Sequence, residues 1–131
     1  MRVAVDTNVL VRAVVRDDKA QAEIAAKLLR NSELLAITLP ALCELVWVLR
    51  RAYGFKAAEV ADAIRALTSA ENVGTDQPAV EAGLAMLDAG GDFADGVIAY
   101  EGRWLGAETF VSFDRKAVEK LKAQGITSRM L

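Results

Sequence analysis

The first fifteen residues, MRVAVDTNVLVRAVV (1–15), contain the strand, acid and helix on which the fold prediction rests. Arg2 to Val5 is short and β-branched, which predicts a strand that ends at Asp6. Thr7 to about Val15 then has the pattern of a helix. An aspartate at this junction is usually a helix cap, because its side chain accepts hydrogen bonds from the free N–H groups of the first turn. Whether Asp6 does more depends on what else reaches the same place.

The rest of the chain continues to alternate strands with helices. Further strands are predicted at Leu35 to Leu39, at Val73, at Glu108 to Ser112 and in the tail after Gly125. Further helices are predicted from the Asp17-Asp18 cap to Leu29, from Ala41 to about Tyr53, from Lys56 to Thr68, from Asp76 to Leu87, from Asp92 to Trp104 and from Arg115 to Ala123. We therefore predict one α/β domain over residues 1–131, with a central, mainly parallel, short-stranded sheet flanked by helices.

Composition excludes several kinds of chemistry. The chain has no histidine, which removes serine and cysteine nucleophiles paired with histidine, and zinc bound by histidine. Its single cysteine, Cys43, cannot form an internal disulfide. No uncharged stretch is long enough to span a bilayer, and we see no signal peptide. We expect a cytoplasmic protein whose acid-base or metal chemistry depends on carboxylates.

Four carboxylates are predicted at the sheet edge where α/β proteins bind ligands. Asp6 closes the first strand, Glu44 lies near the start of the helix after the second strand, and Asp114 follows the Phe110-Val111 strand. Asp95 lies near the start of another helix, and Asp92 precedes it by three residues on the same face.

Each of these acids also has a purely structural interpretation. The aspartates at 6, 92 and 114 all precede helices and could serve only as caps. Glu44 interrupts the uncharged run ALCELVWVL (41–49), and a partly buried carboxylate there needs a partner, which could be a distant arginine or a metal ion. The joint pattern favours a metal, because converging carboxylates repel one another unless a cation compensates them. Ligands that are all oxygen favour Mg²⁺ or Mn²⁺.

The spacing of these motifs resembles a known family. MRVAVDTNVLV, LPALCELVWVL, GGDFADGVIAYEGRWLG and TFVSFDRK, in this order, are similar to the PIN-domain ribonucleases, and most of all to the VapC-type toxins of prokaryotic toxin–antitoxin pairs. The resemblance covers nearly the whole chain. It implies a PIN-like α/β fold and metal-dependent hydrolysis of RNA phosphodiesters that leaves 5′-phosphate and 3′-hydroxyl ends.

The resemblance also implies roles for particular residues. Asp6, Glu44 and Asp95 match the three core acids, and Asp114 matches a more variable fourth. Asp92 and Ser112 match accessory positions that help to hold the metal or a water, and Thr7 and Asn8 match polar neighbours of the first acid. The implied partners are an RNA substrate, a cognate antitoxin protein and a second copy of the chain in a homodimer.

The charge of the chain is compatible with an RNA substrate. The formal net charge is −2, but without the four site acids the balance is 14 acidic residues against 16 basic ones. Candidate phosphate contacts are Arg50, Arg51, Arg115 and Lys116, followed by Lys120 and Lys122, although a solvated helix face explains each of them equally well. Trp47 and Trp104 lie in apolar helical runs, which favours core or interface positions over base stacking.

Three classes of function therefore stay open. The first is a magnesium-dependent endoribonuclease toxin that a cognate antitoxin inhibits. The second is a catalytically silent interaction module with the same fold, which loss of activity on mutating Asp95 would exclude. The third is a phosphoacceptor signalling domain, which the sequence disfavours because a single acid ends the first strand and Ser112-Phe113-Asp114 stands where a lysine is needed.

Overall fold

The computed structural model describes all 131 residues, which form seven helices and five short strands. The chain divides into two compact units, Met1–Asp76 and Gln77–Leu131. Both units combine helices with parallel strands, so the predicted α/β class with short parallel strands is confirmed. The single domain predicted over residues 1–131 stays a prediction. No helix has both the length and the apolar character that crossing a membrane requires.

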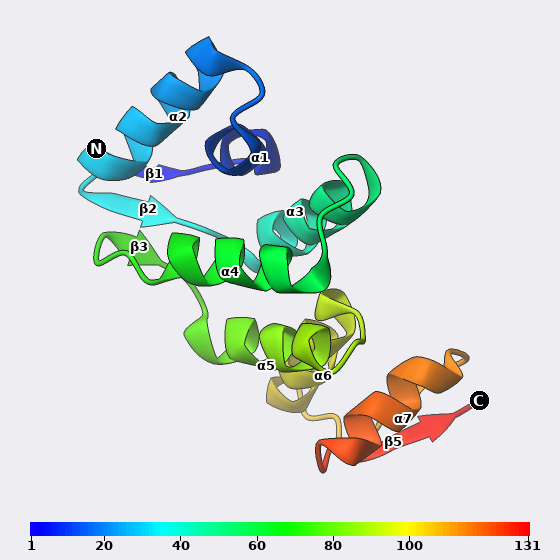
Figure 1. Ribbon diagram of the computed structural model, residues 1–131. Coiled ribbons are helices and arrows are strands. Elements are labelled where there is room, and N and C mark those ends of the chain that lie inside the picture. The colour runs from blue at the N-terminus through cyan, green and yellow to red at the C-terminus, as the bar shows by residue number, and fades with distance from the viewer. The chain divides into compact units, whose positions relative to one another are not determined.

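The first unit contains a three-stranded parallel sheet in the order β1-β2-β3 (Figure 1). Its strands are β1 (Arg2–Ala4), β2 (Leu34–Ala36) and β3 (Val73–Gly74), and its helices are α1 (Thr7–Val15), α2 (Lys19–Asn31), α3 (Leu39–Arg51) and α4 (Ala57–Thr68). In the β1–β2 register, Arg2 lies opposite Leu34 and Ala4 opposite Ala36. Because β1, β2 and β3 are parallel, each connection between them must cross over, and helices form both crossovers.

Several boundaries in the first unit differ from the prediction, most of all those of β2 and α3. The second strand ends at Ala36 rather than Leu39, because α3 already begins at Leu39. The hydroxyl of Thr38 accepts a hydrogen bond from the N–H of Ala41, and Pro40 occupies the first turn, where its missing N–H costs nothing. At the other end α3 stops at Arg51, and Gly54 turns the chain with a φ of 66°, a conformation that glycine adopts without strain.

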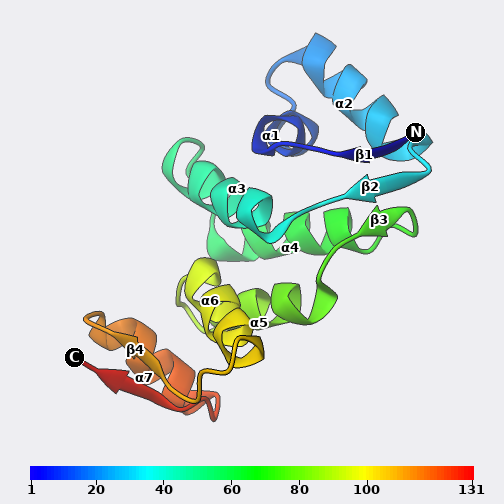
Figure 2. The ribbon, with the colours of Figure 1, turned by 180° about the vertical axis from the view of Figure 1, so that it is seen from behind.

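The second unit pairs two helices with a small helix-covered sheet (Figure 2). Its elements are α5 (Gln77–Asp88), α6 (Phe93–Trp104), β4 (Phe110–Ser112), α7 (Arg115–Ala123) and β5 (Ser128–Met130). Helix α5 packs along α6, and α7 covers the parallel pair β4–β5. Met86 of α5, Ala99 of α6 and Leu121 of α7 form one buried cluster, so the helix pair and the strand pair share a core.

Candidate functional site

Asp6 stands where the first strand becomes the first helix. Its backbone is still extended, and its Oδ1 accepts a hydrogen bond from the N–H of Val9 at 3.2 Å, which caps α1. The capping interpretation of Asp6 is therefore correct. The cap uses one carboxylate oxygen only, and the second, Oδ2, receives no hydrogen bond from the protein. That oxygen can serve as a ligand while the cap stays in place.

Glu44 is held beside this junction by the residue next to Asp6. The hydroxyl of Thr7 donates a hydrogen bond to Glu44 Oε2 at 2.9 Å, and Thr7 itself is only 8% exposed. Glu44 is exposed, so the expectation that it is partly buried was wrong: the buried side chains of α3, among them Leu42 and Leu45, lie on another face. Its partner within the protein is this hydroxyl rather than an arginine. Sequence reasoning had noted Thr7 only as a polar neighbour.

A groove between α1 and α2 begins at the same acid. Its volume is about 380 Å³, and its lining residues are Asp6, Asn8, Val9 and Arg12 of α1 and Gln21, Ile24, Ala25 and Leu28 of α2. The side chain of Ile24 is 69% exposed, while Ala22 and Ala25 make the buried contacts of α2. The groove therefore combines apolar side chains of both helices with the polar groups of Asn8, Arg12 and Gln21, and it has a carboxylate where α1 begins.

In the second unit, the stretch DFADG (92–96) begins α6, and each of its larger residues has a distinct task. Asp92 caps the helix, its Oδ1 accepting the N–H of Ala94 at 3.1 Å. Phe93 is fully buried, and it fills the space over Gly83 of α5. Gly96 lies so close to α5 that a Cβ atom there would meet the backbone of Ala82. Asp95, between these two anchors, is half-buried and receives no hydrogen bond.

Asp114 occupies the corresponding junction between β4 and α7. Its Oδ1 accepts hydrogen bonds from the N–H groups of Lys116 and Ala117, which caps α7, and its Oδ2 receives none. Ser112 accepts a hydrogen bond on Oγ from the N–H of Asp114 at 2.9 Å. The predicted accessory residue Ser112 thus acts on the backbone of Asp114, which it holds in the turn that follows β4.

The three acids of this unit influence one another electrostatically. The pKa of Asp95 is raised above its ordinary value of 3.8, first by burial, then by the negative charges of Asp92 and Asp114. A cation placed among these carboxylates would remove both the repulsion and part of the desolvation cost. Because all the available donor atoms are oxygens, the set fits Mg²⁺ or Mn²⁺.

The acids predicted to form one site are thus brought together in two groups. Asp6 and Glu44 belong to the first unit, and Asp95, Asp114 and Asp92 belong to the second. Neither unit by itself brings three or more acidic or thiol side chains within reach of one metal ion. The clustering of all four core acids stays a prediction. Sequence reasoning missed the packing role of Gly96, although a glycine inside a helix pattern often signals close approach of another backbone.

The predicted phosphate contacts and the tryptophans lie at the surface. Arg50, Arg51, Arg115 and Lys116 are all exposed. Trp47 of α3 is 61% exposed and Trp104 of α6 is 77% exposed, so neither is a core residue, contrary to that part of the expectation. The apolar runs around them misled the prediction, because in each run the buried positions are filled by other residues.

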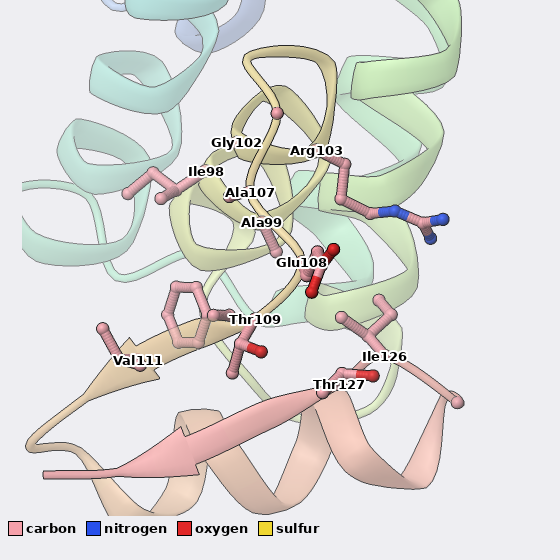
Figure 3. Close-up of a pocket in the computed structure, with 13 residues that line it drawn as sticks. Ile98, Ala99, Gly102, Arg103, Ala107, Glu108, Thr109, Val111, Ile126 and Thr127 are labelled. Atoms are coloured by element: carbon pink, nitrogen blue, oxygen red, sulfur yellow. The ribbon is translucent and has the colours of Figure 1, made fainter.

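The second unit has a hollow of about 680 Å³ where α6 and the segment after it face β4 and β5 (Figure 3). Figure 3 shows mainly apolar and hydroxyl side chains around it, with Arg103 and Glu108 as its charged groups. None of the acids predicted to form the site lines this hollow. Asp92, Asp95 and Asp114, rather than the hollow, therefore define the candidate site of this unit.

Comparison with known proteins agrees with the motif pattern. The family model described as PIN domain matches residues 3–122, a range that covers most of each unit and every predicted site residue. No curated protein matches the chain.

Proposed function

Since the chain belongs to the PIN-domain family, whose members are nuclease-type domains, we propose that it is a magnesium-dependent endoribonuclease toxin inhibited by a cognate antitoxin. The substrate is RNA, and the reaction is hydrolysis of a phosphodiester bond that leaves 5′-phosphate and 3′-hydroxyl ends. The toxin works in the cytoplasm as a homodimer. The observation that carries the catalytic proposal is Asp95, which the buried Phe93 and the close-packed Gly96 hold half-buried at the start of α6, in the field of the Asp92 and Asp114 carboxylates.

Asp6, Glu44, Asp95 and Asp114 hold Mg²⁺ or Mn²⁺ in this proposal, with Asp92 and Ser112 as accessory residues. Three of the aspartates use Oδ1 to cap a helix, which leaves Oδ2 of each for the metal. A bound divalent cation makes a water more acidic and neutralises charge on the phosphoryl group, which suits a chain without histidine.

The remaining polar residues position these ligands or bind the substrate. Thr7 holds Glu44 through its hydroxyl, and Ser112 holds the backbone of Asp114, so both acids have a defined direction before any metal binds. Pre-oriented ligands lose less conformational freedom on binding. Arg115 and Lys116 follow Asp114 directly and are exposed, which suits contact with RNA phosphates.

The nuclease proposal is tested with protein purified free of antitoxin and incubated with RNA in Mg²⁺, Mn²⁺ or EDTA. We expect cleavage with either metal and none in EDTA. Asp6→Asn and Asp95→Asn should each abolish cleavage and leave the fold intact, because asparagine keeps the shape of the side chain and removes its charge. Cleavage at the parent's rate by either variant would show that the residue is not an essential ligand.

The groove between α1 and α2 supports the antitoxin part of the proposal. It offers Val9, Ile24 and Leu28 to an apolar segment and Asp6 to a basic side chain. An arginine is the expected basic group, because its guanidinium pairs with carboxylates in bidentate geometry. Such an arginine would occupy the place of the metal, so that inhibition and loss of metal go together. Ile24 and Leu28 of α2 line this groove, whereas Trp47 of α3 does not.

This inhibition is tested by expressing the chain together with the protein from the neighbouring small open reading frame. We expect a stable complex that does not cut RNA, and a much weaker one for Ile24→Glu, which places a charge in the groove. Lys19→Glu, an exposed change on the same helix outside the groove, is the matched control. A complex that cleaves RNA as fast as the free protein would refute this mechanism of inhibition.

A further inference from the structure

One exposed face of α3 combines a candidate ligand with an aromatic ring and a guanidinium. Glu44, Trp47 and Arg51 are spaced three and four residues apart, so their side chains follow one another along the same side of the helix. The core contacts of α3, including Leu42, Leu45 and Leu49, occupy the opposite side. From Glu44 to Arg51 this face extends about 10 Å along the helix axis. We call these three residues the α3 strip.

The ring in the α3 strip is held in place and still open to solvent. The Arg51 guanidinium carbon lies 5.9 Å from the centre of the Trp47 ring, a cation–π arrangement that orients both side chains. The Trp47 side chain is nevertheless 61% exposed. Leaving a large apolar ring in water costs free energy that burial would recover. The exposed part of the indole is therefore a ready contact for another flat, apolar surface.

The charges around Trp47 favour a nucleobase over a protein surface. Arg50 and Arg51 are exposed, and the Arg51 guanidinium lies over the Trp47 ring, so a protein partner would have to desolvate charges in order to cover one aromatic side chain. An RNA strand can stack a base on the ring while its phosphates pair with these arginines, which compensates the charges in place.

We propose that Trp47 and Arg51 form a base-stacking subsite for unpaired RNA next to the scissile phosphate. The inference rests on the proposed ribonuclease function, and it adds that the substrate is single-stranded at this position. Trp47 stacks on one base, and Arg51 contacts the adjoining phosphate. Trp47 is thus a substrate-positioning residue, in contrast to the core or interface position expected from the sequence.

The test is RNA binding by variants built in an Asp95→Asn background, which keeps the strand intact in Mg²⁺. The probe is a fluorescein-labelled single-stranded RNA dodecamer of mixed sequence, followed by anisotropy. We expect Trp47→Ala to weaken binding about 5- to 150-fold, the usual effect of losing one stacked base. Trp47→Phe should retain most of the affinity, because a phenyl ring still stacks. Trp104→Ala, which removes the other exposed indole, is the matched control and should have no effect.

Three results would overturn the subsite: unchanged binding by Trp47→Ala, an equal loss in Trp104→Ala, or an equal loss when the dodecamer is fully base-paired. A change in oligomeric mass on Trp47→Ala, measured by light scattering, with RNA binding unchanged would assign Trp47 to a protein interface and would likewise refute it. Failure of the proposed function is seen separately, as no Mg²⁺-dependent cleavage by the chain with Asp95 intact. If that chain binds no RNA at all, both proposals are wrong.

Discussion

Replacing Gly96 by alanine tests whether the close packing of α6 against α5 positions Asp95. A Cβ atom at Gly96 would lie 2.9 Å from the carbonyl carbon of Ala82 and closer still to its oxygen, and a backbone atom cannot rotate out of the way. Overpacking of this kind costs about 1–3 kcal/mol, against a gain of about 1 kcal/mol in helix propensity. We expect a net loss of up to about 2 kcal/mol in the free energy of unfolding.

Gly102 of the same helix provides the matched control. A Cβ atom there would meet only the Cβ of Ala107, at 3.8 Å, which is an ordinary contact. Gly102→Ala should therefore gain up to about 1 kcal/mol from helix propensity alone. The two variants should differ by the overpacking cost, about 1–3 kcal/mol, in urea unfolding followed by circular dichroism.

The same pair of variants connects packing to catalysis. If α6 moves away from α5 by about 1 Å, Asp95 moves with it, and a displacement of that size can reduce a reaction rate about 100-fold. RNA cleavage by Gly96→Ala should fall by one to two orders of magnitude on that scale, while Gly102→Ala keeps the parent's rate. Two variants of equal stability, within about 0.5 kcal/mol, would refute the packing argument.

Three further predictions concern individual acids and their supports. Asp95→Asn should raise the melting temperature in metal-free buffer. The pKa of Asp95 is raised in the folded state, so ionisation of this carboxyl costs stability as the pH rises above about 3.8. The gain in melting temperature should therefore be absent at lower pH, and a gain independent of pH would contradict this. Thr7→Val keeps the shape of a buried residue and removes the hydrogen bond to Glu44. The rate of RNA cleavage should fall, while the free energy of unfolding changes by no more than about 1–2 kcal/mol. An unchanged rate would show that this hydrogen bond does not position Glu44 for catalysis. Asp114→Asn should lose activity and keep the α7 cap, because asparagine still accepts the N–H groups of the first turn. Asp114→Ala should lose activity and also about 1 kcal/mol of stability. Equal stability of the two variants would mean that the cap contributes little.

Local sequence patterns were sufficient to predict the elements and most of their ends. Asp6, Asp92 and Asp114 mark helix starts because capping is a local interaction between one side chain and the next few N–H groups, so it can be read from neighbouring residues. The second strand was predicted too long, because the pairing that limits it to Leu34–Ala36 comes from Arg2–Ala4, far away in the sequence.

Tertiary contacts of the candidate site could not be read in this way. The partner of Glu44 is the hydroxyl of Thr7, thirty-seven residues away, and nothing near Glu44 in the sequence indicates it. Trp47 and Ile24 are apolar residues in amphipathic helices, but the buried positions on those helices are taken by Leu45, Leu49, Ala22 and Ala25. Hydrophobicity alone does not say which apolar residues the fold leaves at the surface.

The most direct test of the central claim, that Asp6 and Asp95 serve the same metal ion, is a double-mutant cycle on Mn²⁺ affinity. Binding of Mn²⁺ is measured calorimetrically for the parent, for Asp6→Asn, for Asp95→Asn and for the double variant. If both carboxylates hold one ion, each single change removes most of the affinity and the second change adds little, because interacting sites are not additive. Strictly additive losses, or full affinity in either single variant, would contradict a shared metal.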